Sequence, residues 1–199
     1  MKNSMWSLKL STSALVLIPA AVGINYIGKL FAGLLKLPLW LDAIGTVLSA
    51  MLAGPVVGAI CGAINNIIYG LTMDPISFIY ALTSIGIGLA VGIMAHRNGI
   101  NSIGRAIVVG LVLAVVATVI STPINIRFWG GQTGNVWGDL VYASMVAHHL
   151  PVWMASAVDE FIVDVPDKIA TVIVAFGIYK GLPQKLTILF RHDSQTEKL

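Results

Sequence analysis

Long apolar stretches, separated by short polar connections, dominate this chain. A bilayer core about 30 Å thick needs roughly 20 mostly apolar residues per helix, and fewer where a span is short or buried. The pattern therefore predicts six membrane-spanning helices. They cover residues 11–33, 40–54, 56–72, 77–95, 106–123 and 166–182. The stretch 125–165 is too long for a turn, and we expect a partly structured outer segment there.

Composition agrees with this pattern. Of the 199 residues, 57% are hydrophobic and 11% are charged, and the mean hydropathy is +0.87. These values are typical of integral membrane proteins, so the expected fold is a single all-α membrane domain over residues 1–199. The first apolar run follows Lys2 and Lys9, as in a signal peptide, but its continuation through INYIGKLFAGLL favours an uncleaved span.

The basic residues predict an orientation. With six spans, both termini lie on one side of the membrane, and most basic residues fall on that side. These residues are Lys2, Lys9, Arg97, Arg105, Lys180, Lys185, Arg191 and Lys198. The positive-inside rule makes this side the cytoplasm. Acidic residues gather at the opposite side, at Asp42, Asp74, Asp139, Asp159, Glu160, Asp164 and Asp167; because acids contribute little to orientation, their placement needs a separate cause.

Four of the predicted helices are polar in their outer halves and apolar in their inner halves. In the second helix, Asp42, Thr46 and Ser49 follow a spacing of i, i+4 and i+7, which places them on one face. The corresponding residues of the other three helices are Ser77, Tyr80, Thr83 and Ser84; Thr118, Ser121, Thr122 and Asn125; and Asp164, Asp167, Lys168 and Thr171. A polar cavity open to the outside and closed toward the cytoplasm explains the four stripes together.

Each stripe taken alone has a simpler explanation. Serine and threonine often bond backbone carbonyls within membrane helices, and acids at helix ends often act as caps. Asp164 with Pro166 fits the first turn of the last span, and Asp167 with Lys168 fits an ordinary surface pair. The convergence of all four stripes favours the cavity.

Small residues repeat along the third predicted helix. Gly54, Gly58 and Gly62 recur every four residues, which allows another helix to approach closely. The same face continues to Asn65 and Asn66 near the middle of the membrane, where an unpaired amide is costly. We expect one of these asparagines to bond a neighbouring helix and the other to line the floor of the cavity.

Aromatic residues lie close to the predicted cavity. Trp40, Trp129, Trp137 and Trp153 fall on the outer side, where interfacial tryptophans are common in any membrane protein. The stretch NIRFWGGQTGNVWGD (125–139) interleaves aromatic residues with four glycines and predicts a mobile lid. Flat rings above a polar cavity suit a planar heterocycle that forms hydrogen bonds.

The residue patterns of common catalytic and metal sites are missing. His148 and His149 are adjacent and point to different helical faces, and no H-x-x-x-H or H-E-x-x-H spacing occurs. Cys61 is the single cysteine, and there is no G-x-x-x-x-G-K-[ST] phosphate loop or nucleophile elbow. The basic residues behind the net charge of +3 are scattered. We therefore expect no enzyme activity, no metal, no cofactor and no nucleic-acid partner.

Two stretches of the chain resemble a known family. The run LPLWLDAIGTVLSAMLAGPVVGAICGAINNIIYGL (37–71) resembles the substrate-binding S components of energy-coupling factor (ECF) vitamin transporters, and VDVPDKIATVIVAFGIY (163–179) is similar to the last helix of several of them. The resemblance implies a receptor in the bacterial cytoplasmic membrane that captures a vitamin from outside, under the loop between helices 1 and 2. It also implies the partners, which are membrane lipid, a coupling transmembrane protein and two ATPase subunits, on which the receptor docks and topples to release its ligand.

Helix 1 is the docking element in this family, usually through an A-x-x-x-A face. The corresponding stretch SALVLIPAAVG lacks an exact match, and Pro19 interrupts the spacing. The small residues that would meet the coupling protein are Ala14, Ala20, Ala21 and Gly23.

Ten residues are the candidates for contact with the ligand. They are Trp40, Asp42, Asn66, Tyr69, Tyr80, Asn125, Trp129, His149, Glu160 and Asp164. An acid-rich mouth favours a neutral or cationic ligand over an anionic one, and among ring-containing vitamins we favour the pyridoxine-like vitamin B6 group, with a thiamine precursor or cobalamin as alternatives. The rival function is a membrane sensor for a small molecule. The tail RHDSQTEKL is too short for an output domain, which favours transport.

Overall fold

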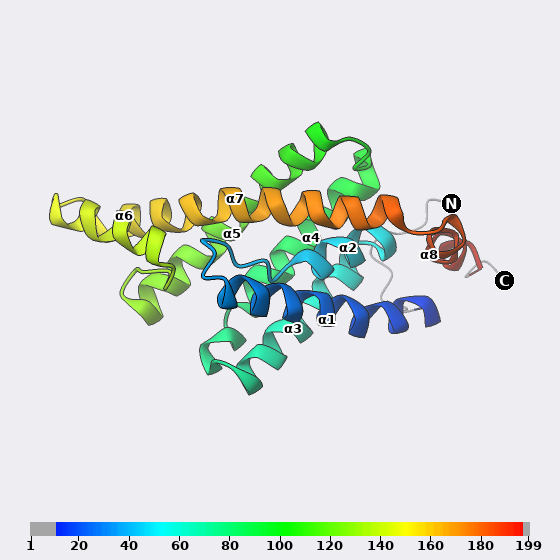
Figure 1. The fold of residues 1–199 in the computed structure, drawn as a ribbon, viewed down its shortest axis with the longest axis horizontal. Coiled ribbons are helices and arrows are strands. Elements are labelled where there is room, and N and C mark those ends of the chain that lie inside the picture. Colours follow the sequence, from blue (N-terminus) through cyan, green and yellow to red (C-terminus); the bar gives the residue numbers. More distant parts are fainter. Residues whose placement is uncertain (1–10, 197–199) are drawn as a thin grey trace.

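The computed structural model describes residues 11–196 and arranges them as a bundle of helices (Figure 1). The elements run in the order α1 (Thr12–Leu34), α2 (Ile44–Ala53), α3 (Pro55–Thr72), η1 (Pro75–Phe78), α4 (Ala81–Asn98), α5 (Ile103–Trp129), α6 (Val136–Ala147), α7 (Val152–Gly181) and α8 (Gln184–Thr196). The short η1 is a 3-10 helix. No strand occurs within the described range, which confirms the all-α fold class.

Within residues 11–196, four helical segments are long and apolar enough to cross a membrane. They are Thr12–Leu34, Pro55–Thr72, Pro75–Asn98 and Ile103–Trp129. Their outward faces carry many exposed leucine, isoleucine and valine side chains, most clearly on α1 and α5. Apolar surface of this extent is rare on soluble monomers, and a lipid-facing helix requires it. The helices thus indicate a membrane-embedded protein.

The second predicted span differs from the structure. Residues 35–43 form an irregular loop, in which Lys36 and Leu41 adopt positive φ values of 51° and 50°. Helix α2 has only 10 residues and rises about 15 Å, half the thickness of a bilayer core. The expected helix over 40–54 is therefore too long, because its first four residues belong to the loop.

Helix α7 also corrects the sequence-based expectation. It is one continuous helix of 30 residues that joins the end of the expected outer segment to the expected last span. Pro166 lies inside it instead of at its first turn. A proline inside a helix costs about 3 kcal/mol, and the packing of α7 along both α5 and α6 outweighs that cost. The hairpin of α6 and the first part of α7 extends beyond the other helices (Figure 1).

Glycines set the closest helix contacts. A Cβ atom on Gly58 would lie 3.2 Å from the backbone oxygen of Gly88, and one on Gly62 would lie 2.7 Å from the backbone oxygen of Ser84. Both partners belong to α4, so the glycine spacing in α3 correctly predicts a close helix neighbour. Gly110 does the same between α5 and α7.

Asn25 joins three helices in the buried core. Ala43, the residue before α2, has no side chain that can cap the helix. Instead the Asn25 Oδ1 on α1 accepts hydrogen bonds from the backbone N–H groups of Gly45 at 2.6 Å and Thr46 at 3.3 Å. These are N–H groups of the first turn, which have no partner within the helix. Asn25 therefore caps α2 from a different helix, and its own carbonyl accepts from the Tyr69 hydroxyl on α3 at 2.8 Å.

Candidate functional site: a polar cavity

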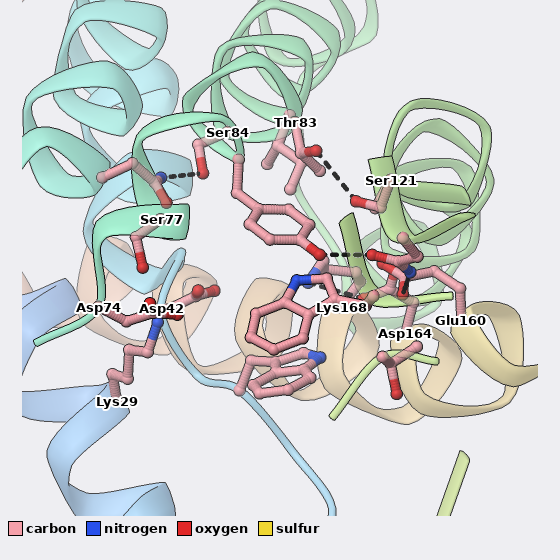
Figure 2. A pocket seen from close by; sticks show the side chains of 18 residues that line it. Lys29, Asp42, Asp74, Ser77, Thr83, Ser84, Ser121, Glu160, Asp164 and Lys168 are labelled. Atoms are coloured by element: carbon pink, nitrogen blue, oxygen red, sulfur yellow. Dashed lines mark hydrogen bonds and ion pairs between the residues drawn. The ribbon is translucent and has the colours of Figure 1, made fainter. Parts of the chain in front are cut away.

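A polar cavity of about 150 Å³ lies where α1 and α5 end and α4 begins. Figure 2 shows the side chains that surround it, which come from α1, the loop 35–43, α3, η1, α4, α5, the loop after α5 and α7. The lining residues are Lys29, Trp40, Asp42, Asn66, Asp74, Ser77, Tyr80, Thr83, Ser84, Ile87, Ala117, Ser121, Asn125, Trp129, Thr133, Glu160, Asp164 and Lys168. Segments that are far apart in the sequence thus meet around one space.

Eight of the ten candidate contact residues line this cavity. They are Trp40, Asp42, Asn66, Tyr80, Asn125, Trp129, Glu160 and Asp164. The helical spacing of the polar stripes brings most of them together, because each stripe faces the interior of the bundle. Asn66 combines the two roles considered for the asparagine pair, since it lines the cavity and also donates from Nδ2 to Ser84 Oγ on α4 at 2.6 Å.

Tyr69 is not among the lining residues. Its side chain is completely buried, and its hydroxyl donates to the backbone of Asn25. The ring packs against Tyr26 at a centroid distance of 5.4 Å, and the Lys29 ammonium lies 4.2 Å from the ring centroid. Tyr69 therefore does not line the cavity, but its ring packs against Lys29, which does.

His149 is also outside the cavity. It lies in the turn between α6 and α7, is exposed and has a positive φ of 60°. Because α7 begins at Val152 and continues without a break, this turn is about 12 Å further along the helix axis than Glu160. A separate short last helix would have allowed the turn to fold back, and the continuous helix prevents it.

Several lining residues were missed as ligand contacts. The stripe on α4 already contains Thr83 and Ser84, and the stripe on α5 contains Ser121, so helical spacing could have found all three. Lys29 gives no such signal, because it lies within the apolar first helix and belongs to none of the four polar stripes. Its place depends on the packing of α1 against α3.

A buried ionic cluster on α7 borders the cavity. The Lys168 ammonium lies 3.0 Å from Asp164 Oδ1 and 2.6 Å from Asp167 Oδ2, and all three side chains are at most 4% exposed. The interpretation of Asp167 and Lys168 as a surface pair is therefore wrong. Pro166 points outward from the same turn, so the charged residues face the bundle while the proline is exposed.

Asp167 connects this cluster to the loop 35–43. Its Oδ1 accepts hydrogen bonds from the backbone N–H groups of Trp40 at 2.9 Å and Leu41 at 2.8 Å. The loop carries Trp40 and Asp42, both of which line the cavity. One buried carboxylate thus positions a wall of the cavity by bonding to the backbone, without lining the cavity itself.

A chain of hydrogen bonds holds Glu160. The Tyr80 hydroxyl donates to Asn125 Oδ1, and Asn125 Nδ2 donates to Glu160 Oε2 at 2.8 Å. These three residues come from the start of α4, the end of α5 and the first half of α7. The chain orients the carboxylate in the cavity wall, and neither donor in it carries a charge.

Asp164 has one unused acceptor. Its Oδ1 pairs with Lys168, whereas its Oδ2 accepts no hydrogen bond from any described residue. The residue is 1% exposed and lines the cavity. A buried acceptor without a partner is unfavourable by about 1–3 kcal/mol, and more if it is charged. The free oxygen therefore favours a donor inside the cavity.

The loop after α5 is fixed by two carboxylates. Thr133, which lines the cavity, donates from Oγ1 to Asp159 Oδ1 at 2.9 Å and from its backbone N–H to Asp139 Oδ1 at 3.1 Å. Positive φ values at Gly130, Gly131 and Gly134 allow the tight path of this loop. The stretch expected to form a lid does border the cavity, and it is tied to both α6 and α7.

The candidate docking residues on α1 separate into two pairs. Ala14 and Ala21 are buried and pack in the core with residues of α3 such as Val57, so they cannot form an outer face for a partner. This corrects that part of the expectation. Ala20 is exposed and Gly23 is half-buried, with open space where a Cβ atom would be.

Comparisons of this chain with protein-family models, with curated proteins and with solved structures found no match.

Proposed function

We propose that this protein is the substrate-binding subunit of an ECF-type importer, and that the cavity holds a small ring-containing vitamin. The observation that carries the proposal is the cavity itself. Its wall combines polar side chains from five α-helices and η1, and it includes Asp164, whose buried Oδ2 has no partner among the described residues. Concave sites with a few convergent polar groups are the usual form of small-molecule sites.

The size of the cavity narrows the choice of vitamin. A cavity of 150 Å³ in another protein binds benzene, so about this volume suits one ring with small substituents. The vitamin B6 group and the pyrimidine precursor of thiamine are of this size. Cobalamin is many times larger, which argues against it. We favour the pyridoxine-like vitamin B6 group.

The distribution of charge supports a cavity that faces outside. The basic residues Arg97, Arg105 and Lys180 lie at the end of α4, the start of α5 and the end of α7. The cavity is lined by the opposite ends of α4 and α5 and by Glu160, Asp164 and Lys168 near the middle of α7. Under the positive-inside rule the basic end is cytoplasmic, so the cavity opens outward. In this arrangement the six membrane passages are α1, α2, α3, α4, α5 and α7. Because α2 is short, it makes the second passage together with the loop 35–43.

Delivery of the ligand requires partners in this proposal. The exposed side of α1, which includes Ala20 and leucine and valine side chains, is available to a coupling transmembrane protein. Two ATPase subunits bound to that protein would supply the energy, because the chain has no phosphate-binding loop of its own.

Thermal unfolding of the purified protein with a panel of vitamins tests the proposal. The panel contains pyridoxine, pyridoxal, pyridoxamine, the pyrimidine precursor of thiamine, and cobalamin. A ligand that binds only the folded state at 100 times its Kd adds about 2.7 kcal/mol to the stability, so we expect one single-ring compound to raise the unfolding temperature.

A matched pair of variants places the binding in the cavity. Trp129 lines the cavity and Trp137 does not, and both side chains are more than 40% exposed. Trp129→Ala should weaken the thermal shift, and Trp137→Ala should leave it unchanged. If a well-folded sample responds to none of the vitamins, the transport proposal fails and the membrane-sensor function becomes the better one.

A further inference from the structure

The charges around the cavity do not balance. Four carboxylates line it, at Asp42, Asp74, Glu160 and Asp164, and two ammonium groups do, at Lys29 and Lys168. Asp167 lies directly behind the wall and takes part of the charge of Lys168, at 2.6 Å. The lining is therefore short of positive charge, most of all on α7.

The carboxylates on α7 are the least compensated. Glu160 and Asp164 are one helical turn apart on the same face, and both are more than 90% buried. Glu160 accepts a hydrogen bond from the neutral amide of Asn125, and Asp164 shares one lysine with Asp167. Buried like charges at this spacing repel each other, and a further cation nearby would relieve that repulsion.

The free oxygen of Asp164 indicates where a positively charged group would bind. Asp164 lines the cavity, and its Oδ2 is buried and accepts no hydrogen bond within the described part of the chain. A ligand that donates an N–H to this oxygen would satisfy it, and a positively charged donor would do so most strongly. A neutral hydroxyl would supply the hydrogen bond without the charge.

The rest of the wall suits an aromatic ring. Trp40, Tyr80 and Trp129 line the cavity, and aromatic faces attract cations as well as stack on rings. Ile87 and Ala117 supply an apolar surface on α4 and α5. The cavity therefore offers a ring site next to a carboxylate site.

We propose that the ligand is a small aromatic ring bearing a protonated amine or amidine, which pairs with Asp164 and Glu160. This inference rests on the proposed function and narrows its substrate to cationic ring compounds. Asp164 receives an N–H of the cation at Oδ2, and Glu160 lies one turn away as the second counter-charge. The aromatic side chains hold the ring.

Two pairs of compounds test the charge requirement. Pyridoxamine and pyridoxine share a ring and differ in one substituent, which is an ammonium-bearing carbon in the first and an alcohol in the second. The aminomethyl and hydroxymethyl forms of 4-amino-2-methylpyrimidine form the second pair. Isothermal titration of the full-length protein at neutral pH measures all four. Hydrogen bonds to charged groups contribute about 1.5–3 kcal/mol, so we expect the ammonium member of at least one pair to bind about tenfold to a hundredfold more tightly.

Variants connect the preference to the two carboxylates. Asp164→Asn should reduce the affinity for the ammonium compound by about tenfold or more and change that for the alcohol far less. Glu160→Gln should have the same effect on the two affinities. It provides a second test if Asp164→Asn prevents folding. Trp137→Ala is the control, because the exposed Trp137 side chain lies outside the cavity lining and its loss removes no carboxylate.

The outcomes separate this inference from the proposed function. If the alcohols bind as tightly as the ammonium compounds, or if neither variant changes the preference, the cation requirement is wrong while the protein is still a vitamin receptor. If none of the four compounds, nor any other vitamin of the panel, binds to a folded sample, both proposals fail.

Discussion

The side chain of Asp167 accepts a hydrogen bond from the backbone N–H of Trp40 at 2.9 Å, although 127 positions separate the two residues in the chain. The contact joins the loop 35–43 to the last long helix. It explains how a loop with two positive φ values is held in one conformation next to the cavity. The same carboxylate pairs with Lys168, so the loop and the ionic cluster depend on each other.

Replacing Asp167 should therefore destabilise the protein strongly. Asp167→Ala removes the acceptor of two backbone N–H groups and one partner of a buried lysine. Breaking a buried ion pair costs about 3–5 kcal/mol, so we expect a large fall in the unfolding temperature in detergent. Asp167→Asn keeps one oxygen for the N–H groups and should cost less. Equal unfolding temperatures for the alanine variant and the wild type would show that this contact does not hold the loop.

Asn25 provides a second test of the core. Asn25→Ala removes the cap of α2 and leaves two buried N–H groups and the Thr46 hydroxyl without their partner. We expect a loss of about 2–4 kcal/mol in the free energy of unfolding, measured by denaturant titration.

Asn65→Ala is the matched control for this substitution. Asn65 is equally buried, but it makes one long hydrogen bond of 3.4 Å to the Asp42 carbonyl, and its own oxygen has no partner among the described residues. Its replacement should cost clearly less. A similar loss for both variants would mean that the cost comes from the cavity left behind and that capping contributes nothing.

Much of the site could be predicted from helical spacing. Polar residues at i, i+4 and i+7 must share a face, and a helix in lipid turns such a face toward its neighbours. Tyr80, Asn125 and Asp164 reach the cavity for this reason. The glycine repeat of α3 likewise leads directly to its contact with α4.

The remaining features depend on contacts between distant segments. Tyr69 has the spacing of a lining residue, but its hydroxyl bonds to Asn25 on another helix, which turns it away from the cavity. The continuity of α7 through Pro166 is likewise decided by its packing on α5 and α6, because local propensity alone favours a break there. No local pattern shows that Asn25 caps a helix that begins 19 positions later.

Two glycines on α5 test the packing that aligns the cavity walls. A Cβ atom on Gly110 would lie 2.7 Å from the Ile169 Cα on α7, a backbone atom that cannot move aside alone. Gly110→Ala should push α5 from α7 and cost about 1–3 kcal/mol in the free energy of unfolding. Gly104 has nothing within 4 Å, so Gly104→Ala should stabilise α5 by up to about 1 kcal/mol. If both variants unfold at the same temperature, the close approach of the two helices at Gly110 is wrong.

Thr133 links the loop over the cavity to α7, and its hydroxyl can be removed almost without changing its shape. In Thr133→Val the Asp159 carboxylate and the Asn135 N–H each lose a hydrogen bond, of 2.9 and 3.1 Å. Because each bond contributes about 1 kcal/mol, we expect the loop 130–135 to open several times more often. Limited proteolysis of the purified protein should show faster cleavage in this loop, and a bound vitamin should dissociate faster. Thr133→Ser keeps the hydroxyl and should behave like the wild type. Cleavage of the valine variant at the wild-type rate would mean that the remaining backbone bonds to Asp139 and Asp159 are enough to hold the loop closed.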